Sequence, residues 1–200
     1  MKARSLVLLT LAALTTGTAL AADDPPKFKV FGGFSYVAPL GEEDVTLGTV
    51  RDSVKASRHL GWTVGLEARF NKLMGLEFDY VNATNDVKFG GRTVGDVHMQ
   101  PLSATLNFHL IPSRKVDFYI GPTVSYFIFG DVDLGSAGGG SFNTDNEFAG
   151  GASAGLEIGL GDTVAIMGGI RYLNVDIKPD GAPNIPVDPL FSRLGLAFRW

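Results

Sequence analysis

Histidines and serines are the side chains of this sequence that could perform acyl-transfer chemistry, which needs a hydroxyl nucleophile, a general base and a carboxylate. The candidates are His59, His98 and His109 with Ser57, Ser103 and Ser125. None of these histidines belongs to a recognisable catalytic motif with a serine, and a structural or solvated role accounts for each of them better. The sequence therefore predicts no catalytic residue and a protein that is not an enzyme.

Residues that could hold a metal or a cofactor are equally sparse. The 200 residues include no cysteine, which excludes disulfides, thiolate metal sites and a cysteine nucleophile. Residues 131–135 (Asp-Val-Asp-Leu-Gly) resemble part of a calcium loop but lack its regular ligand spacing and its terminal glutamate. We expect no metal and no cofactor, and the net charge of −4 argues against a nucleic-acid partner.

The first 21 residues have the pattern of a secretory signal peptide. Lys2 and Arg4 precede an uncharged stretch from Leu6 to Leu20, and the small residues Ala19 and Ala21 fit a cleavage site. The alternative, an uncleaved membrane anchor, is disfavoured because the stretch is short and rich in Ala and Thr. We predict cleavage after Ala21 and an exported domain over residues 22–200.

Alternating hydrophobicity dominates the exported part and predicts strands. From Leu60 to Phe70, every second residue is apolar, while the residues between them are small or polar. Similar segments predict eight strands, at about 27–38, 59–70, 74–82, 97–110, 117–129, 147–160, 163–177 and a last strand ending at Trp200.

The connections between these strands alternate in length. Residues 71–73, 111–116 and 161–162 form short turns, whereas residues 39–58, 83–96, 130–146 and 178–189 form long loops. Short turns at one rim and long loops at the other are typical of outer-membrane barrels. The predicted fold class is all-β, an eight-stranded antiparallel up-and-down transmembrane β-barrel with both termini at the periplasmic rim.

Glycine indicates which strand face points inward. The chain has 26 glycines in 200 residues, nearly twice the usual proportion of about 7 per cent. Within the strands the glycines lie on the same face as the charged residues. A barrel of eight strands encloses a lumen that is just wide enough to be filled by side chains. Small and charged residues therefore face the lumen and bulky apolar ones face lipid. The rival, a soluble lipocalin-like barrel, would have the opposite orientation.

Several segments from residue 97 onward resemble the OmpW family of small outer-membrane barrels. Residues 97–106, with Pro101 near their start, are similar to that family's fourth strand, and residues 118–129 to its fifth. Residues 171–177 and 188–200 are similar to its last two strands. The resemblance implies an eight-stranded barrel whose apolar interior passes small hydrophobic molecules.

The lumen-facing residues suggest a hydrophobic-solute pocket near the extracellular rim. Its predicted members are Val37, Val81, Phe127, Phe129 and Leu173. Charged and polar residues lie on the same face nearer the periplasm, namely Glu67, Arg69, Glu77, Asp79, Tyr119, Glu157 and Arg199. An apolar pocket above a charged layer would admit a hydrophobic solute and prevent direct passage. Plain packing, in which the phenylalanines plug the barrel, is an equally open interpretation.

Prolines interrupt two predicted strands. Pro101 and Pro122 each remove one hydrogen bond of the ladder. Our hypothesis is that Pro101 marks a lateral opening through which an apolar solute leaves into the bilayer. The alternative is a simple bulge.

The final strand has the pattern of an assembly signal. Leu194, Leu196, Phe198 and Trp200 alternate with small or basic residues and end on an aromatic residue. We expect this strand to be read by the outer-membrane assembly machinery.

These observations together predict a protein of the Gram-negative outer membrane. The leading function is a channel or carrier for small hydrophobic molecules. The alternatives are a structural or adhesive barrel that acts through its extracellular loops and, less favoured, a lipid-modifying enzyme. The expected partners are outer-membrane lipid, the assembly machinery and small hydrophobic solutes. The solute and the oligomeric state are left open by the sequence.

Overall fold

The computed structural model describes residues 25–40, 43–47, 50–56, 59–89, 92–129, 132–133, 141–142, 146–177, 185–186 and 188–200. The predicted signal peptide and its cleavage site lie outside these residues. Within the described part of the chain, no helix is long and apolar enough to cross a membrane.

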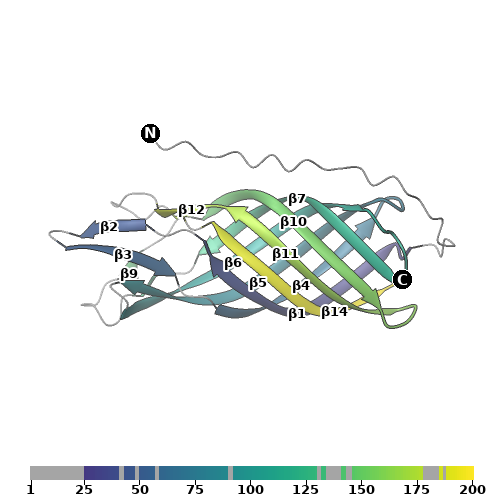
Figure 1. Ribbon diagram of the computed structural model, residues 1–200, viewed down its shortest axis with the longest axis horizontal. Coiled ribbons are helices and arrows are strands. Elements are labelled where there is room, and N and C mark those ends of the chain that lie inside the picture. Colours follow the sequence, from purple (N-terminus) through teal and green to yellow (C-terminus); the bar gives the residue numbers. More distant parts are fainter. Residues whose placement is uncertain are drawn as a thin grey trace.

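Eight long antiparallel strands close into a barrel, which confirms the predicted fold class (Figure 1). They are β1 (Phe28–Pro39), β4 (His59–Arg69), β5 (Met74–Phe89), β6 (Arg92–His109), β7 (Val116–Phe129), β10 (Glu147–Gly159), β11 (Val164–Asn174) and β14 (Pro189–Arg199). Each strand pairs with its neighbour along the chain, and β1 pairs with β14. Closure leaves no unpaired barrel edge in hydrocarbon.

The strand register sets the tilt of the strands. Following paired residues from Val64 through β5 and β6 leads to Tyr126 on β7. Following them the other way, through β1, β14, β11 and β10, leads to Val116 on the same strand, ten residues away. A ten-residue offset around eight strands corresponds to a tilt of about 40°, and the strands run obliquely in Figure 1.

Shorter strands occur where long loops were expected, which corrects the sequence prediction. They are β2 (Glu43–Leu47), β3 (Val50–Ala56), β8 (Val132–Asp133), β9 (Ser141–Phe142) and β13 (Ile185–Pro186). The predicted strand 163–177 ends at Asn174 in the structure, and its last two residues form the separate short strand β12 (Asp176–Ile177), which pairs with β13. The predicted loop 83–96 is instead largely strand, because β5 continues to Phe89 and β6 begins at Arg92. Its sequence lacks an apolar–polar alternation, since neither face of a hairpin beyond the membrane needs to meet lipid.

The two ends of the barrel differ as the sequence predicts. The β2–β3 hairpin and β9 extend beyond one end, and the C-terminus lies at the other end (Figure 1). Lys27 and Phe28 donate backbone hydrogen bonds to the carbonyl oxygen of Trp200, over 2.8 and 3.0 Å. The first described residues therefore lie at the same rim as the C-terminus.

The outer face carries bulky apolar side chains and two aromatic belts. Near the extracellular rim, Trp62 lies beside Tyr80 and Tyr126 beside Phe148, with ring centroids 5.5 and 4.8 Å apart. Near the periplasmic rim, Phe28 and Trp200 stack at 6.3 Å. Aromatic belts flanking an apolar band are typical of transmembrane barrels.

Lumen-facing glycines make room inside this narrow barrel. A Cβ on Gly155 would overlap the ring of Tyr119, and one on Gly65 would overlap the ring of Phe31. Both glycines lie on the inward face predicted for them. The large lumen side chains therefore depend on the glycines opposite them.

Candidate functional site

An apolar cluster fills the extracellular end of the lumen. Val37, Val81, Phe127 and Leu173, four of the five predicted pocket residues, all belong to it and are buried. Four strands bring them together, because each lies on the inward parity of its strand. The side chain of Phe129 lies outside the described part of the chain, although its backbone pairs with Met99.

The apolar cluster has further members that were not predicted from the sequence. They include Met99, Val175 and Phe191, and the Phe127 and Phe191 rings are 6.3 Å apart. All three could have been predicted, because alternate residues of a strand lie on the same face. Met99 lies on the same face of β6 as Ser103, and Phe191 lies on the same face of β14 as Arg193. Extending the alternation to the ends of the strands would have identified them as lumen residues.

A belt of buried hydroxyl side chains lies below the apolar cluster. Its members are Ser35, Thr63, Ser103, Thr105, Thr123, Ser125 and Ser153. Ser125 donates a hydrogen bond to Ser103 over 2.8 Å, and the Thr105 and Thr123 hydroxyls share one of the same length. On β1, β6, β7 and β10 these hydroxyl side chains lie between the apolar cluster and the charged side chains, whereas on β5, β11 and β14 the two adjoin directly.

The lower lumen holds an ionic layer in which every carboxylate has a cation beside it. The carboxylates are Glu67, Glu77, Asp79, Asp117 and Glu157, and the cations are Lys29, Arg69, Arg171, Arg193 and Arg199. Charges of opposite sign therefore pair across the lumen. Lys29, Asp117, Arg171 and Arg193 were not named from the sequence, although parity places them on the same face.

The upper part of the ionic layer is centred on Arg171 and Glu77. Arg171 donates two hydrogen bonds to Asp79, over 2.8 and 2.5 Å, and lies 3.4 Å from Glu77. Glu77 also accepts a hydrogen bond from Arg193 over 2.6 Å. Such pairing offsets the cost of burying these charges.

The lower part of the ionic layer surrounds Lys29 and His109. Lys29 lies 2.6 Å from Glu67 and also pairs with Glu157. His109 bridges two carboxylates, with its Nε2 2.7 Å from Glu67 and its Nδ1 3.0 Å from Asp117. Asp117 also pairs with Arg69.

Among the residues that the structure describes, His109 is not assembled with the candidate serines. Both ring nitrogens of His109 face carboxylates, and Ser103 and Ser125 hydrogen-bond to each other. His98 lies 3.0 Å from the hydroxyl of Thr84 near the opposite rim. Ser57 lies outside the described residues, as does the calcium-like segment 131–135 except for the two residues of β8. No cluster of metal-ligating side chains occurs among the described residues.

The β-ladder is interrupted beside both prolines, with no change of register. Between β5 and β6 the pairing skips Val81 and Pro101, and resumes at Ala83 and Met99. Between β6 and β7 a similar interruption lies beside Pro122. Pro101 is buried on the lumen side next to Phe127, whereas Pro122 faces outward.

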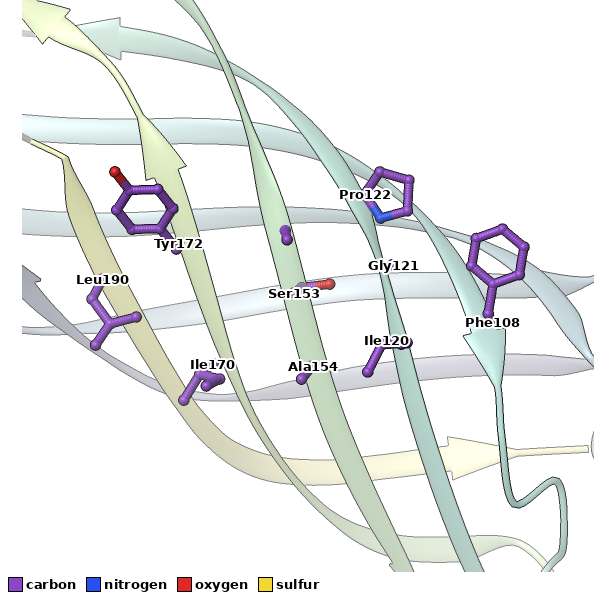
Figure 2. Close-up of a pocket in the computed structure, with 10 residues that line it drawn as sticks. Phe108, Ile120, Gly121, Pro122, Ser153, Ala154, Ile170, Tyr172 and Leu190 are labelled. Carbon is purple, nitrogen blue, oxygen red and sulfur yellow. The ribbon is translucent and has the colours of Figure 1, made fainter. Parts of the chain in front are cut away.

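A hollow of about 510 Å³ lies on the outer face of the barrel, beside Pro122 rather than Pro101 (Figure 2). Its floor is formed by small side chains of β7 and β10, including Ala152 and Ala154. Phe108 lies at one end, and Tyr172 lies at the other.

Comparison with known proteins agrees with this architecture. The model of the outer membrane protein β-barrel domain matches residues 6–198. No curated protein sequence matches the chain significantly.

Solved structures of small outer-membrane barrels share the fold. OprG from Pseudomonas aeruginosa has a TM-score of 0.77 and 18% identity, covering 88% of this chain and 96% of that chain. AlkL, solved in lipid bilayers, has a TM-score of 0.65 and 20% identity, covering 90% and 92%. Outer membrane protein W from E. coli has a TM-score of 0.55 and 17% identity, covering 90% and 100%.

The family match and these neighbours support an outer-membrane location, and they confirm the resemblance that the sequence predicted. The chain belongs to the family of outer membrane protein β-barrel domains, and it shares the fold of OprG, AlkL and outer membrane protein W.

Proposed function

We propose that the barrel is a passive carrier that moves small hydrophobic molecules from its extracellular end into the bilayer. The observation that carries this proposal is the apolar cluster of the upper lumen, which includes Val37, Phe127 and Leu173. An apolar solute gains free energy when it leaves water for such surroundings, at about 25 cal/mol per Å² of apolar surface buried. The proposal needs no cofactor and no catalytic step.

The ionic layer below the cluster supports a sideways exit. A hydrophobic solute that continued toward the periplasm would have to separate pairs such as Arg171–Asp79 and Arg193–Glu77. An unpaired buried charge is strongly penalised. Leaving through the wall avoids this cost.

Pro101 lies where such an exit would be most accessible from the cluster. The ladder interruption between β5 and β6 involves Pro101 and Val81, and Val81 is a cluster member. Fewer hydrogen bonds have to break there than elsewhere along this strand pair. This placement supports the hypothesis of a lateral opening at Pro101.

Uptake of a radiolabelled alkane by intact cells tests the proposed function. Leu173→Asn keeps the side-chain size but adds a polar amide to the apolar cluster, and we expect several-fold slower uptake. Met167→Asn is the matched control, because Met167 is a buried lumen residue in a separate apolar cluster with Phe31.

The folded fraction of both variants is measured by heat modifiability, so that uptake is compared per folded barrel. Equal uptake by the wild-type protein and Leu173→Asn would overturn the carrier proposal. The alternative of a structural or adhesive barrel would then be favoured.

A further inference from the structure

The outer hollow is a furrow between two rows of paired residues that cross the strands. One row is Phe108, Ile120, Ala154 and Ile170, and the other is Pro122, Ala152, Tyr172 and Leu190. Elsewhere the outer face carries mainly bulky side chains, whereas each of these rows has an alanine, Ala154 or Ala152, between larger neighbours. The furrow is therefore a local depression with higher ends.

The position of the furrow determines which medium fills it. Pro122 and Ala152 lie near the middle of β7 and β10, well below the aromatic pair Tyr126 and Phe148 and well above Trp200. At this depth the surroundings are hydrocarbon. Its volume of about 510 Å³ is within the roughly 300–1,000 Å³ typical of small-molecule sites.

The furrow also has a chemical direction. Among its outward-facing side chains, Tyr172 alone carries a polar group, and it lies toward the extracellular end of β11 and opposite Phe108 across the furrow. The opposite end, at Phe108 and Ile120, is entirely apolar. Figure 2 shows the Tyr172 hydroxyl and the Phe108 ring at opposite ends of the lining residues. An occupant that fits has a hydrogen-bond acceptor at one end and a hydrocarbon tail at the other.

We propose that this furrow is a binding site for one acyl chain of a lipid from the extracellular leaflet. The ester carbonyl of the lipid accepts a hydrogen bond from the Tyr172 hydroxyl. The chain then lies over Ala152, Pro122 and Ala154 and ends toward Phe108. A resident lipid here is distinct from the solute proposed for the lumen, because the two sites lie on opposite faces of the barrel wall.

The shape of the furrow favours a lipid chain over a second copy of the barrel. The floor lies below Ile120, Ile170 and Tyr172, so the convex face of another barrel would touch these side chains and leave the floor empty. A single flexible chain reaches the floor and covers it. The shape of the furrow therefore favours an acyl chain, rather than a protein, as the occupant.

Native mass spectrometry of the folded protein with dimyristoylphosphatidylcholine tests retention of a lipid. We expect the wild-type barrel to retain one lipid after gentle detergent removal, and Ala152→Phe to retain it at least several-fold less often. Ala154→Phe provides a second variant within the furrow and should lower retention in the same way, since Ala154 also forms its floor. Leu156→Phe is the matched control, because Leu156 faces lipid on the same strand outside the furrow.

Orientation is tested in nanodiscs with phosphatidylcholine spin-labelled near the ester or near the chain end. The ester-side label should broaden the NMR signals of Tyr172 most, and the chain-end label those of Phe108. Tyr172→Phe should lower lipid retention while leaving the folded fraction unchanged.

Three results would overturn the proposal. The first is no retained lipid on the wild-type barrel, and the second is equal loss with Leu156→Phe. The third is cross-linking of two barrels through a cysteine introduced as Ala152→Cys, which would assign the furrow to a second copy of the chain.

Discussion

Single glycines determine where large side chains fit in this lumen. Gly155 faces the ring of Tyr119, and Gly65 faces that of Phe31. An aromatic ring cannot move aside as a flexible chain end can, so an added methyl group at these positions must distort the packing. By contrast, a Cβ at Gly150 on the outer face meets nothing within 4 Å.

We therefore predict that Gly155→Ala destabilises the barrel by about 1–3 kcal/mol, the usual cost of overpacking. Gly150→Ala should leave stability almost unchanged. Urea unfolding in lipid vesicles measures both variants. Equal stability of the two would contradict this account of the inward glycines.

The Arg171–Asp79 pair gives a second prediction at the residue scale. Both partners are buried, so Arg171→Leu leaves Asp79 without its two hydrogen bonds. We expect a loss of about 3–5 kcal/mol in the free energy of unfolding, as for other buried pairs that lose one partner. The double variant Arg171→Leu, Asp79→Leu should recover much of this loss, and a purely additive effect would argue against the pair.

At the scale of elements, the residue that follows β14 takes part in closing the barrel. The Trp200 carbonyl accepts hydrogen bonds from Lys27 and Phe28, and its ring stacks on Phe28. The last residue of the chain therefore joins the first barrel strand. Trp200, which belongs to the predicted assembly signal, thus has a structural role in barrel closure.

Deletion of Trp200 should lower the folded, heat-modifiable fraction in isolated outer membranes. Trp200→Phe keeps both the backbone bonds and an aromatic ring, and should assemble normally. Normal assembly of the deletion variant would refute a role of this residue in assembly.

The prolines of β6 and β7 allow a matched test of the lateral opening. Pro101→Val restores an N–H group beside the interruption between β5 and β6, and should lower alkane uptake by closing the wall. Pro122→Val restores one between β6 and β7, away from the apolar cluster, and should leave uptake unchanged. Unchanged uptake in Pro101→Val would remove the lateral exit.

At the scale of the whole molecule, the lumen is layered from apolar at one end to ionic at the other. On several strands the hydroxyl belt lies between these layers, and residues such as Tyr119, Glu77 and Asp117 are fully buried in the lower half. Ions that crossed would have to displace several mutually paired charges.

Planar bilayers containing the folded barrel should therefore show little or no single-channel conductance. Arg193→Ala removes a bulky cation beside Glu77 and is expected to raise the conductance or its noise. A large, steady conductance of the wild-type protein would contradict a closed ionic layer.

Much of the barrel was predictable from period-two alternation. Each face of a membrane-spanning strand meets one environment, so the parity of Trp62 and Leu66 identifies the lipid face, and that of Glu67 the lumen. The same rule extends to Lys29, Arg171 and Phe191, which the sequence analysis did not name. The rule fails above the membrane, where the sequence shows no alternation. There β5 nevertheless continues to Phe89, and β6 already begins at Arg92.

The sequence by itself determined the strand order, the inward face and the composition of the lumen, because these depend on local alternation and on closure. Only the tertiary structure decided which charges meet, such as Lys29 with Glu157 across 128 positions of the chain. It also decided that small residues of β7 and β10 align into a furrow. Both the charge pairs and the furrow follow from the ten-residue register offset. The register determines which side chains of distant strands lie at the same level along the barrel axis.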